Sequence, residues 1–514
     1  MKSSDETSGS LTRRSVMGVL WMGIGKVGNA VLQLAVLVVL ARMVAPADFG
    51  VLSAALVVLG FSAIFADLGL APAIIQRPNL EQRHLDTAFT TSVLIGLAAG
   101  GAIALTAPLA ARFFRVDELM PVLRVLALAF PLHGVTFIAE SLAKRELRFR
   151  WLSAVDVSAY AIGYGVVGVG LAIAGWNVWA LVAAELVRAL ARAGILLAGQ
   201  RDRARLGWDA LAFRELMYVG GGFTIARIAN FLALQGDNLV VGRALGPVAL
   251  GLYGRAYQLM TAPASALGNV LSTVLFPAMA LVQADRARLA GAYRRAVATV
   301  AAAVLPVSVI VVILAPEIIR LALGPQWSAA VLPFQVLTAG LLFRTSYKMS
   351  DSLARATGSV YRRAWRQIVY AGLVIGGAMV GQRWGIGGVA VAVVVALAVN
   401  FGLMAHLSLS VSGLRWTSFV RVHLPPMALA AACGPMVWGV ARGVRDLGLP
   451  PLAVVGIAGG ATAIWGLLLV WSAPAVFLGQ DVLWMLSTLR SYLPSRLGHR
   501  APLPPVPSPA PESP

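Results

Sequence analysis

Long apolar runs constrain this chain more than any other feature. Uninterrupted hydrophobic stretches follow one another along almost the whole sequence, separated by short segments rich in charge, glycine or proline. A run of about 20 apolar residues crosses the hydrocarbon core of a bilayer as one helix. Of the 514 residues, 59% are hydrophobic and only 12% are charged, whereas soluble proteins carry about 25% charged residues. The sequence therefore predicts an all-α polytopic membrane protein.

The punctuation between the runs divides the chain into predicted spans. We expect fourteen transmembrane helices, at 16–41, 49–73, 88–111, 119–142, 152–175, 177–199, 217–245, 250–280, 293–319, 329–353, 367–384, 386–410, 422–442 and 450–472. The first run is too long for a signal-peptide core of about 7–15 residues, so it is predicted to remain as a span. Residues 1–15 form a polar leader, and 476–514 form a tail that is proline-rich and predicted to be disordered from about 501.

The positive charges decide the orientation. The 42 Lys and Arg against 22 Asp and Glu give a net charge of +20, which in a soluble protein would suggest nucleic-acid binding. With the N-terminus inside, 27 of these cations fall on cytoplasmic segments and eight on outside connections. This asymmetry follows the positive-inside rule and predicts that both termini are cytoplasmic. Because the cations are spread over eight separate segments, we expect no nucleic-acid partner.

Few residues are suited to hold a metal or to carry out covalent chemistry. Cys433 is the single cysteine, and the five histidines show no metal-ligand spacing, so we expect no metal and no cofactor. Four tryptophans at predicted span ends are interpreted as membrane-interface anchors: Trp151, Trp176, Trp327 and Trp384.

An internal repeat organises the spans. Shifting the sequence by 201 positions aligns the first span with the seventh, and a shift of 208 aligns the third with the ninth. The matched pairs are Lys26 with Arg227, Asn29 with Asn230, Arg42 with Arg243, Pro46 with Pro247, Gly50 with Gly251, Pro108 with Pro316 and Arg112 with Arg320. Each repeat holds six spans, an even number, so both copies enter the membrane in the same orientation. The repeat predicts two parallel six-helix lobes around a central cavity, residues 16–200 and 201–410, followed by two extra helices within 411–475.

Polar residues inside the spans are the candidates for function. Charges at this depth cost at least about 2.5–3.5 kcal/mol each, so they should face a cavity or a partner. Three polar stripes at helical spacing provide the predicted substrate-binding residues, which are Lys26, Asn29 and Gln33, then Arg227 and Asn230, then Arg255 and Gln258. The structural alternative is that these side chains bond between packed helices. Three cations and few acids favour an anionic substrate such as a phosphate, with the amides binding sugar hydroxyls.

Other intramembrane charges are open to more than one interpretation. Asp67, Asp156 and Asp237 could bind a coupling proton or sodium ion, although a lone carboxylate is more often a structural partner. Glu185 and Arg188 are expected to pair with each other. Arg344, Lys348 and Asp351 share a face near the cytoplasmic end of span ten, where snorkelling to the headgroups is favoured.

Four segments resemble a known family when taken together. They are LARMVAPADFGVLSAALVVLGFSAIFADLGLAPAIIQR at 40–77, AKRELRFRW at 143–151, GDNLVVGRALGPVALGLYGRAYQL at 236–259 and LFPAMALVQADRARLAGAYRRA at 275–296. The chain is similar over residues 11–410 to the polysaccharide transporter family. This family comprises the Wzx-type flippases of the multidrug/oligosaccharidyl-lipid/polysaccharide exporter superfamily, and the likeness is to its colanic-acid exporter branch.

The resemblance implies a protein of the bacterial inner membrane that flips undecaprenyl-diphosphate-linked oligosaccharides to the periplasmic face. It implies rocking between inward-open and outward-open states, with Lys26, Arg227 and Arg255 in the kind of position where the family presents cavity cations. Membrane lipids, a polysaccharide polymerase and a chain-length regulator are the expected partners.

Three rival functions remain open from the sequence. A lipid II flippase would share the fold and an anionic lipid substrate. A cation-coupled drug exporter is disfavoured because the first span carries Lys26 and no acid. A polysaccharide polymerase or ligase would need a long outward loop, and the predicted outside connections are short, so we expect that the chain is not an enzyme.

Overall fold

A computed structural model describes residues 28–66, 70–77, 79–199, 205–220 and 224–492, and these residues form helices joined by turns. The first half contains the helix Gly28–Met43, α2 (Pro46–Ala66), α3 (Leu70–Gln76), α4 (Gln82–Phe114), α5 (Leu119–Leu126), α6 (Ala129–Arg145), α7 (Phe149–Tyr160), the π-helix η1 (Ala161–Gly168), α8 (Val169–Ile173), α9 (Asn177–Ala198) and α10 (Ala210–Gly220).

The second half begins with the longest helical element. It contains α11 (Thr224–Leu281), α12 (Arg286–Ile313), α13 (Ala315–Ala322), η3 (Pro325–Ala330), α14 (Val331–Ala339), α15 (Leu341–Ala356), α16 (Val360–Gly381), η4 (Gln382–Trp384) and α17 (Gly385–Ser412). The chain continues through α18 (Trp416–Arg421), α19 (Leu424–Asp446), α20 (Pro451–Ser472), α21 (Pro474–Phe477) and α22 (Gly479–Tyr492). The leader 1–15 and the tail from 501 lie outside the described residues.

The predicted all-α membrane architecture is confirmed, and its exact number of crossings stays a prediction. Within the described ranges, eight helices are long and apolar enough to span a membrane, or nine if one bent pair counts as a single span. Two crossings can lie within one helical stretch. For example, α11 runs through Gly246, where a φ of 83° breaks the helix. Likewise, α16 and α17 are joined by η4 and pack against each other.

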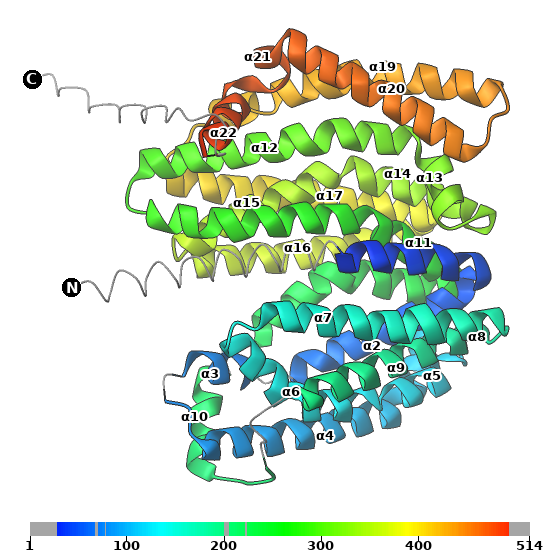
Figure 1. Ribbon diagram of the computed structural model, residues 1–514, viewed down its shortest axis with the longest axis vertical. Helices are drawn as coiled ribbons and strands as arrows, with labels where there is room; N and C mark the ends of the chain where they lie inside the picture. Colours follow the sequence, from blue (N-terminus) through cyan, green and yellow to red (C-terminus); the bar gives the residue numbers. More distant parts are fainter. Residues whose placement is uncertain (1–27, 67–69, 78, 200–204, 221–223, 493–514) are drawn as a thin grey trace, which may run out of the picture.

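Two bundles are visible in Figure 1, with the first-half helices α2 to α10 in one and α11 to α17 in the other. Of the extra helices, α19 packs on the outer side of α12, and α20 packs on α19 and α13. The most extensive contact between the bundles joins α2 to α11.

The crossing of α2 and α11 is held by the repeat itself. A Cβ added to Gly50 would overlap the carbonyl oxygen of Pro247, and a Cβ added to Gly251 would overlap the carbonyl oxygen of Pro46. These four residues are the pairs that the 201-residue shift aligns, so each repeat contributes the same glycine and the same proline to a reciprocal contact. In a bilayer, small residues allow this close backbone approach, because helix association there relies on van der Waals packing.

Further reciprocal contacts lie beside the crossing. The Arg42 guanidinium donates to the carbonyl of Leu321 at 2.6 Å, and its repeat mate Arg243 lies over the Phe113 ring at 5.6 Å. Positions 113 and 321 are themselves related by the 208-residue shift. The two lobes therefore clasp each other through equivalent positions.

Trp327 completes this clasp, and its predicted role as a membrane anchor is wrong. The side chain is 0% exposed, its Nε1 donates to the Ala41 carbonyl at 2.8 Å, and its ring lies 5.5 Å from that of Phe49. A buried indole N–H needs an acceptor, and the carbonyl at the end of the first helix provides one. Trp176 and Trp384 remain exposed, at 55% and 70%.

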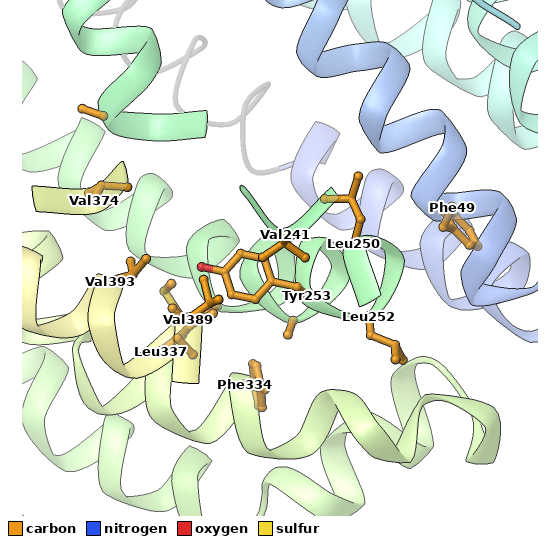
Figure 2. Packing of buried hydrophobic residues seen from close by; sticks show 14 of the residues in the cluster. Phe49, Val241, Leu250, Leu252, Tyr253, Phe334, Leu337, Val374, Val389 and Val393 are labelled. Carbon is orange, nitrogen blue, oxygen red and sulfur yellow. The ribbon is translucent and has the colours of Figure 1, made fainter. Parts of the chain in front are cut away.

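The core of the second bundle surrounds a tyrosine on α11. Figure 2 shows the Tyr253 ring among Val241, Val389 and Leu337. The Tyr253 hydroxyl donates to the Asp237 carboxylate at 2.7 Å. Asp237 is 1% exposed, so this bond gives a partner to a polar group that is buried in the apolar core.

The helix α10, which the sequence did not predict, ties the second repeat to the first lobe. It packs on α3 and α4. Glu215 on α10 accepts a hydrogen bond from Arg77 at 2.6 Å and contacts His84 Nε2 at 2.9 Å. Because Glu81 N–H donates to His84 Nδ1, Nε2 is the nitrogen that donates to Glu215. This bond and the Arg77 charge lower the pKa of the Glu215 carboxyl.

Replacing Gly50 with alanine should destabilise the protein. The new methyl group would push α2 away from the Pro247 backbone, and overpacking of this kind costs about 1–3 kcal/mol. The melting temperature of the purified protein in detergent measures the effect. Gly101→Ala is the matched control, because a Cβ there meets nothing within 4 Å. Equal melting temperatures for the two variants would contradict the close crossing.

Replacing Glu215 with glutamine should loosen α10. A depressed pKa means that the carboxylate contributes stability above its unfolded pKa of about 4.3, and that this contribution is lost on acidification. The protection of 210–220 from hydrogen–deuterium exchange, taken relative to the intrinsic exchange rate at each pH, should therefore fall in the variant at neutral pH, and in the wild type below about pH 4. Glu146→Gln, at an exposed carboxylate, should leave exchange in α10 unchanged. Wild-type protection of α10 in the Glu215 variant would show that the Glu215 carboxylate does not hold α10 in place.

Candidate functional site

Two predicted residues, Lys26 and Asp67, lie outside the described residues. Their neighbours on the first stripe, Asn29 and Gln33, are half-buried on the helix Gly28–Met43. The side-chain oxygen of Asn29 is buried and has no hydrogen-bond partner within the described ranges. A buried acceptor without a partner is uncommon in native proteins, so this position is open to a water molecule or a ligand donor.

Arg255 lies where the two lobes meet. It follows the Gly246 break on α11, and its guanidinium carbon is 4.5 Å from the centre of the Phe49 ring on α2. Its Nη1 donates to the side-chain oxygen of Gln258. Tyr160 and Tyr164 from the first lobe lie close enough to interact with its charge. The sequence-predicted pair Arg255 and Gln258 is thus brought together, and it faces the opposite lobe.

The Arg255 guanidinium keeps a free hydrogen-bond donor. Its Nε is buried without an acceptor, and within the described part of the chain no carboxylate forms an ion pair with it. An aromatic ring attracts a guanidinium through its face and leaves the N–H edge open. A half-buried guanidinium that contacts aromatic rings and a side-chain amide, and that keeps one N–H without an acceptor, can bind an anionic ligand.

The second-stripe residues Arg227 and Asn230 lie at a different depth. Both are exposed and stand near the start of α11, whereas Arg255 follows Gly246 by nine residues. At about 1.5 Å per residue, Arg227 lies about 28 Å from the Gly246 turn along its helix and Arg255 about 13 Å. Of the predicted cations, Arg227 and Arg255 therefore lie at different depths, and these two do not gather in one cluster.

Asn230 borders a polar pocket of about 190 Å³ in the second lobe. The other lining residues are Tyr347, Lys348, Asp351, Arg355, Arg363 and Gln367. Asp351 pairs with both Arg355 and Arg363, so Lys348 and Asp351 are wall residues of a pocket. Snorkelling to the headgroups, which the sequence favoured for them, is wrong, because α16 brings Arg363 and Gln367 against this face of α15.

Arg344, one turn before Lys348, is held by aromatic side chains. Its guanidinium carbon is 4.6 Å from the centre of the Tyr257 ring, and Tyr347 and Tyr370 lie close to its charge. Its Nη1 is buried without a hydrogen-bond partner. Sequence reasoning missed these tyrosines because it counted them as apolar. The signal available was the spacing of Arg344, Lys348, Asp351 and Arg355, which places four charges on one helix face.

Among the carboxylates considered for ion coupling, Asp156 and Asp237 have protein partners. Arg192 donates to Asp156 at 2.9 Å and also binds Glu140 at 3.0 Å. Asp237 accepts from Tyr253 and from the backbone N–H of Asn238. These contacts show what holds Asp156 and Asp237 in place, and their role in coupling stays a prediction.

The expected pairing of Glu185 with Arg188 is confirmed. Arg188 Nε donates to the Glu185 carboxylate at 3.0 Å, and Tyr164 also donates to it at 3.0 Å. Tyr164 stacks on Tyr160, with the ring centres 4.9 Å apart. The pair therefore positions the first-lobe tyrosines that face Arg255.

The chain belongs to the family of polysaccharide biosynthesis proteins, whose family model matches residues 39–332. The matched region includes the α2 and α11 crossing, Arg255 and the first-lobe tyrosines. The apolar helices and the family match therefore define a multi-pass membrane protein of polysaccharide biosynthesis.

Individual relatives agree with this assignment. The lipopolysaccharide biosynthesis protein WzxC of Escherichia coli is 26% identical over 72% of this chain and 77% of its own length. The teichuronic acid biosynthesis protein TuaB of Bacillus subtilis is 23% identical over 90% of this chain and 96% of its own.

A solved structure shares the architecture. The lipid II flippase MurJ in an inward closed conformation superposes with a TM-score of 0.72, covering 92% of this chain and all of that one, at 13% identity. At this identity the likeness establishes the fold alone. It does not identify the substrate.

Removing the Tyr253 hydroxyl should destabilise the second lobe. Tyr253→Phe leaves the buried Asp237 carboxylate short of one donor, which costs about 1–3 kcal/mol. The melting temperature should fall, whereas Tyr361→Phe, at a residue that is 91% exposed, should leave it unchanged. A melting temperature equal to that of the wild type would show that the bond contributes nothing.

Proposed function

We propose that this protein is a flippase that moves undecaprenyl-diphosphate-linked oligosaccharide repeat units from the cytoplasmic to the periplasmic face of the bacterial inner membrane. The product would serve exopolysaccharide, capsule or O-antigen synthesis. Family membership supports a role in polysaccharide synthesis, and the MurJ-like fold supports transport of a lipid-linked substrate.

The observation that carries the proposal is the environment of Arg255. Its guanidinium lies between the lobes, has aromatic partners and leaves its Nε unsatisfied. A diphosphate offers several strong acceptor oxygens and would complete this donor set. Gln258, Asn29 and Gln33 are amides that can bind sugar hydroxyls on the same path.

The depths of the cations suggest an order of engagement. Arg227, near the start of α11 and paired by the repeat with Lys26, would meet the diphosphate first on the cytoplasmic side. Arg255 would then hold it between the lobes. Arg344 and Lys348 offer a further cationic wall in the second lobe. The series moves the anion along the protein, so no single site has to bind it across the whole bilayer.

The clasp beside the crossing indicates which side is closed. Arg42, Arg243 and Trp327 fall on the predicted outer side, and they hold the lobes together there. With both termini in the cytoplasm, this arrangement is closed toward the periplasm. Alternating access would require these contacts to break while the lobes turn about the glycine–proline crossing.

A lipid II flippase is the second candidate, because the MurJ fold matches nearly the whole chain. Complementation separates the two functions. The proposal is supported if the gene rescues a polysaccharide-export mutant and does not rescue a strain depleted of its peptidoglycan flippase. The reverse result would identify the protein as a lipid II flippase. A polymerase and a chain-length regulator are the expected partners in the first case.

Removing the charge of Arg255 should reduce polymer export. Losing a hydrogen bond to a charged group costs about 1.5–3 kcal/mol, which corresponds to roughly 10- to 150-fold weaker binding. Export is measured at matched expression for Arg255→Ala and Arg255→Lys, and the lysine variant should retain part of the activity. Arg286→Ala, at an exposed residue of α12, is the control.

Variants of the other predicted cations extend this test. Lys26→Ala and Arg227→Ala should also lower export, because each removes one step of the series. Normal export in all three alanine variants would overturn the cationic path, whichever lipid the protein carries.

A further inference from the structure

A second pocket lies in the first lobe, away from the cationic series. It has a volume of about 450 Å³ and is formed where the first turn of α2, the start of α5 and the turn before α9 meet. Its lining residues are Asp48, Glu118, Pro121, Val122, Gly175, Trp176, Asn177, Val178 and Trp179. The predicted topology places this pocket on the outer side of the membrane.

The backbone before α9 presents two indole rings to this pocket. Gly175 and Asn177 have φ angles of 78° and 46° on either side of Trp176, and a positive φ at a residue other than glycine is uncommon. The N–H of Trp179 donates to the Trp176 carbonyl at 2.9 Å. Trp176 and Trp179 are 55% and 39% exposed, so this turn and the first turn of α9 hold two accessible rings three residues apart in the sequence.

Two carboxylates, Asp48 and Glu118, line the same pocket. Asp48 lies in the first turn of α2, which packs against α9. Glu118 is exposed. The pocket therefore combines flat apolar faces with acidic acceptors, in a volume typical of small-ligand sites.

We infer that this pocket binds a sugar ring of the transported glycan on the outer side of the membrane. A pyranose has C–H faces that stack on indole rings and hydroxyl groups that donate to carboxylates. The acidic acceptors select neutral or amino sugars and repel anionic ones. This inference rests on the proposed function, since the flipped oligosaccharide is the source of the sugar.

Membrane anchoring alone does not account for the pocket. An interface anchor needs an indole ring at the headgroup level, but two carboxylates beside it would repel the phosphates of the lipids. The pocket is also confined to one lobe. The repeat mate of Asp48 is Ala249, and the mate of Glu118 is Gln326, which instead donates to the Ala41 carbonyl at 2.6 Å.

The pocket is joined directly to the lobe crossing. Asp48 lies between Pro46 and Gly50, the two α2 residues in the reciprocal backbone contact. All the lining residues belong to the first lobe, so a turn of that lobe against α11 carries the whole pocket with it. A sugar held here would be gripped by the first lobe while the diphosphate leaves Arg255.

Ligand-observed saturation-transfer NMR tests the inference with the full-length protein in lipid nanodiscs. The probes are free glucose, galactose, glucosamine, N-acetylglucosamine, glucuronate and choline, each added alone. At least one neutral or amino sugar should receive saturation, and glucuronate should not. The signal should be lost in Trp176→Ala and Trp179→Ala and weakened in Glu118→Gln, and Trp176→Phe should retain part of it.

The controls separate binding from folding and from lipid contact. Trp384→Ala removes another exposed indole of the predicted outer surface and should keep the sugar signal, and all variants should keep the wild-type melting temperature. Sugar signals that survive both alanine variants would overturn the inference. So would a Trp176-dependent choline signal without any sugar signal, because that result would make the pocket a headgroup site.

A transport assay distinguishes this failure from failure of the proposed function. If flipping of lipid-linked oligosaccharide is normal and no sugar of the panel binds through Trp176, the pocket inference fails and the flippase stands. If sugars bind through Trp176 but no lipid-linked oligosaccharide is flipped, the pocket stands as a sugar site and the proposed function fails.

Discussion

The backbone contact between α2 and α11 is the constraint on which the rest of the molecule depends. Two glycines and two prolines, one of each from either repeat, bring the helices close enough that no side chain fits between them. Apolar side chains gain little by leaving lipid for protein, so tight packing must supply the association. The same short stretch of α2 then positions Asp48 in the outer pocket and Phe49 under Arg255.

Repeat symmetry explains why this contact is reciprocal, and it was readable from the sequence. The shift of 201 residues matched Pro46 with Pro247 and Gly50 with Gly251. An alignment cannot tell which face of a helix meets which partner, however, so it did not predict that each glycine would contact the proline of the other repeat. The contacts of Arg42 and Arg243 could not be predicted either. Their partners, Leu321 and Phe113, are aligned by the 208-residue shift, whereas the arginines are aligned by the 201-residue shift.

The errors in the sequence analysis have a common physical cause. Trp327 was assigned to the membrane surface because it lies at a span end, but its indole N–H donates to the Ala41 carbonyl inside the protein. Lys348 and Asp351 were assigned to the headgroups, yet another helix supplies Arg363 to that face. Periodicity along one helix reveals which residues share a face. The chemistry of that face depends on the helix packed against it.

Arg255 shows how charge and lobe position are linked. Half-buried cations such as Arg192 are neutralised by carboxylates and so serve the structure. Arg255 instead rests on the Phe49 ring, which belongs to the opposite lobe. A turn of the lobes about the glycine–proline crossing must change this contact. Under the proposed function, an anion bound to Arg255 would therefore have a different affinity in each arrangement, and a ligand shifts a conformational equilibrium only through such a difference.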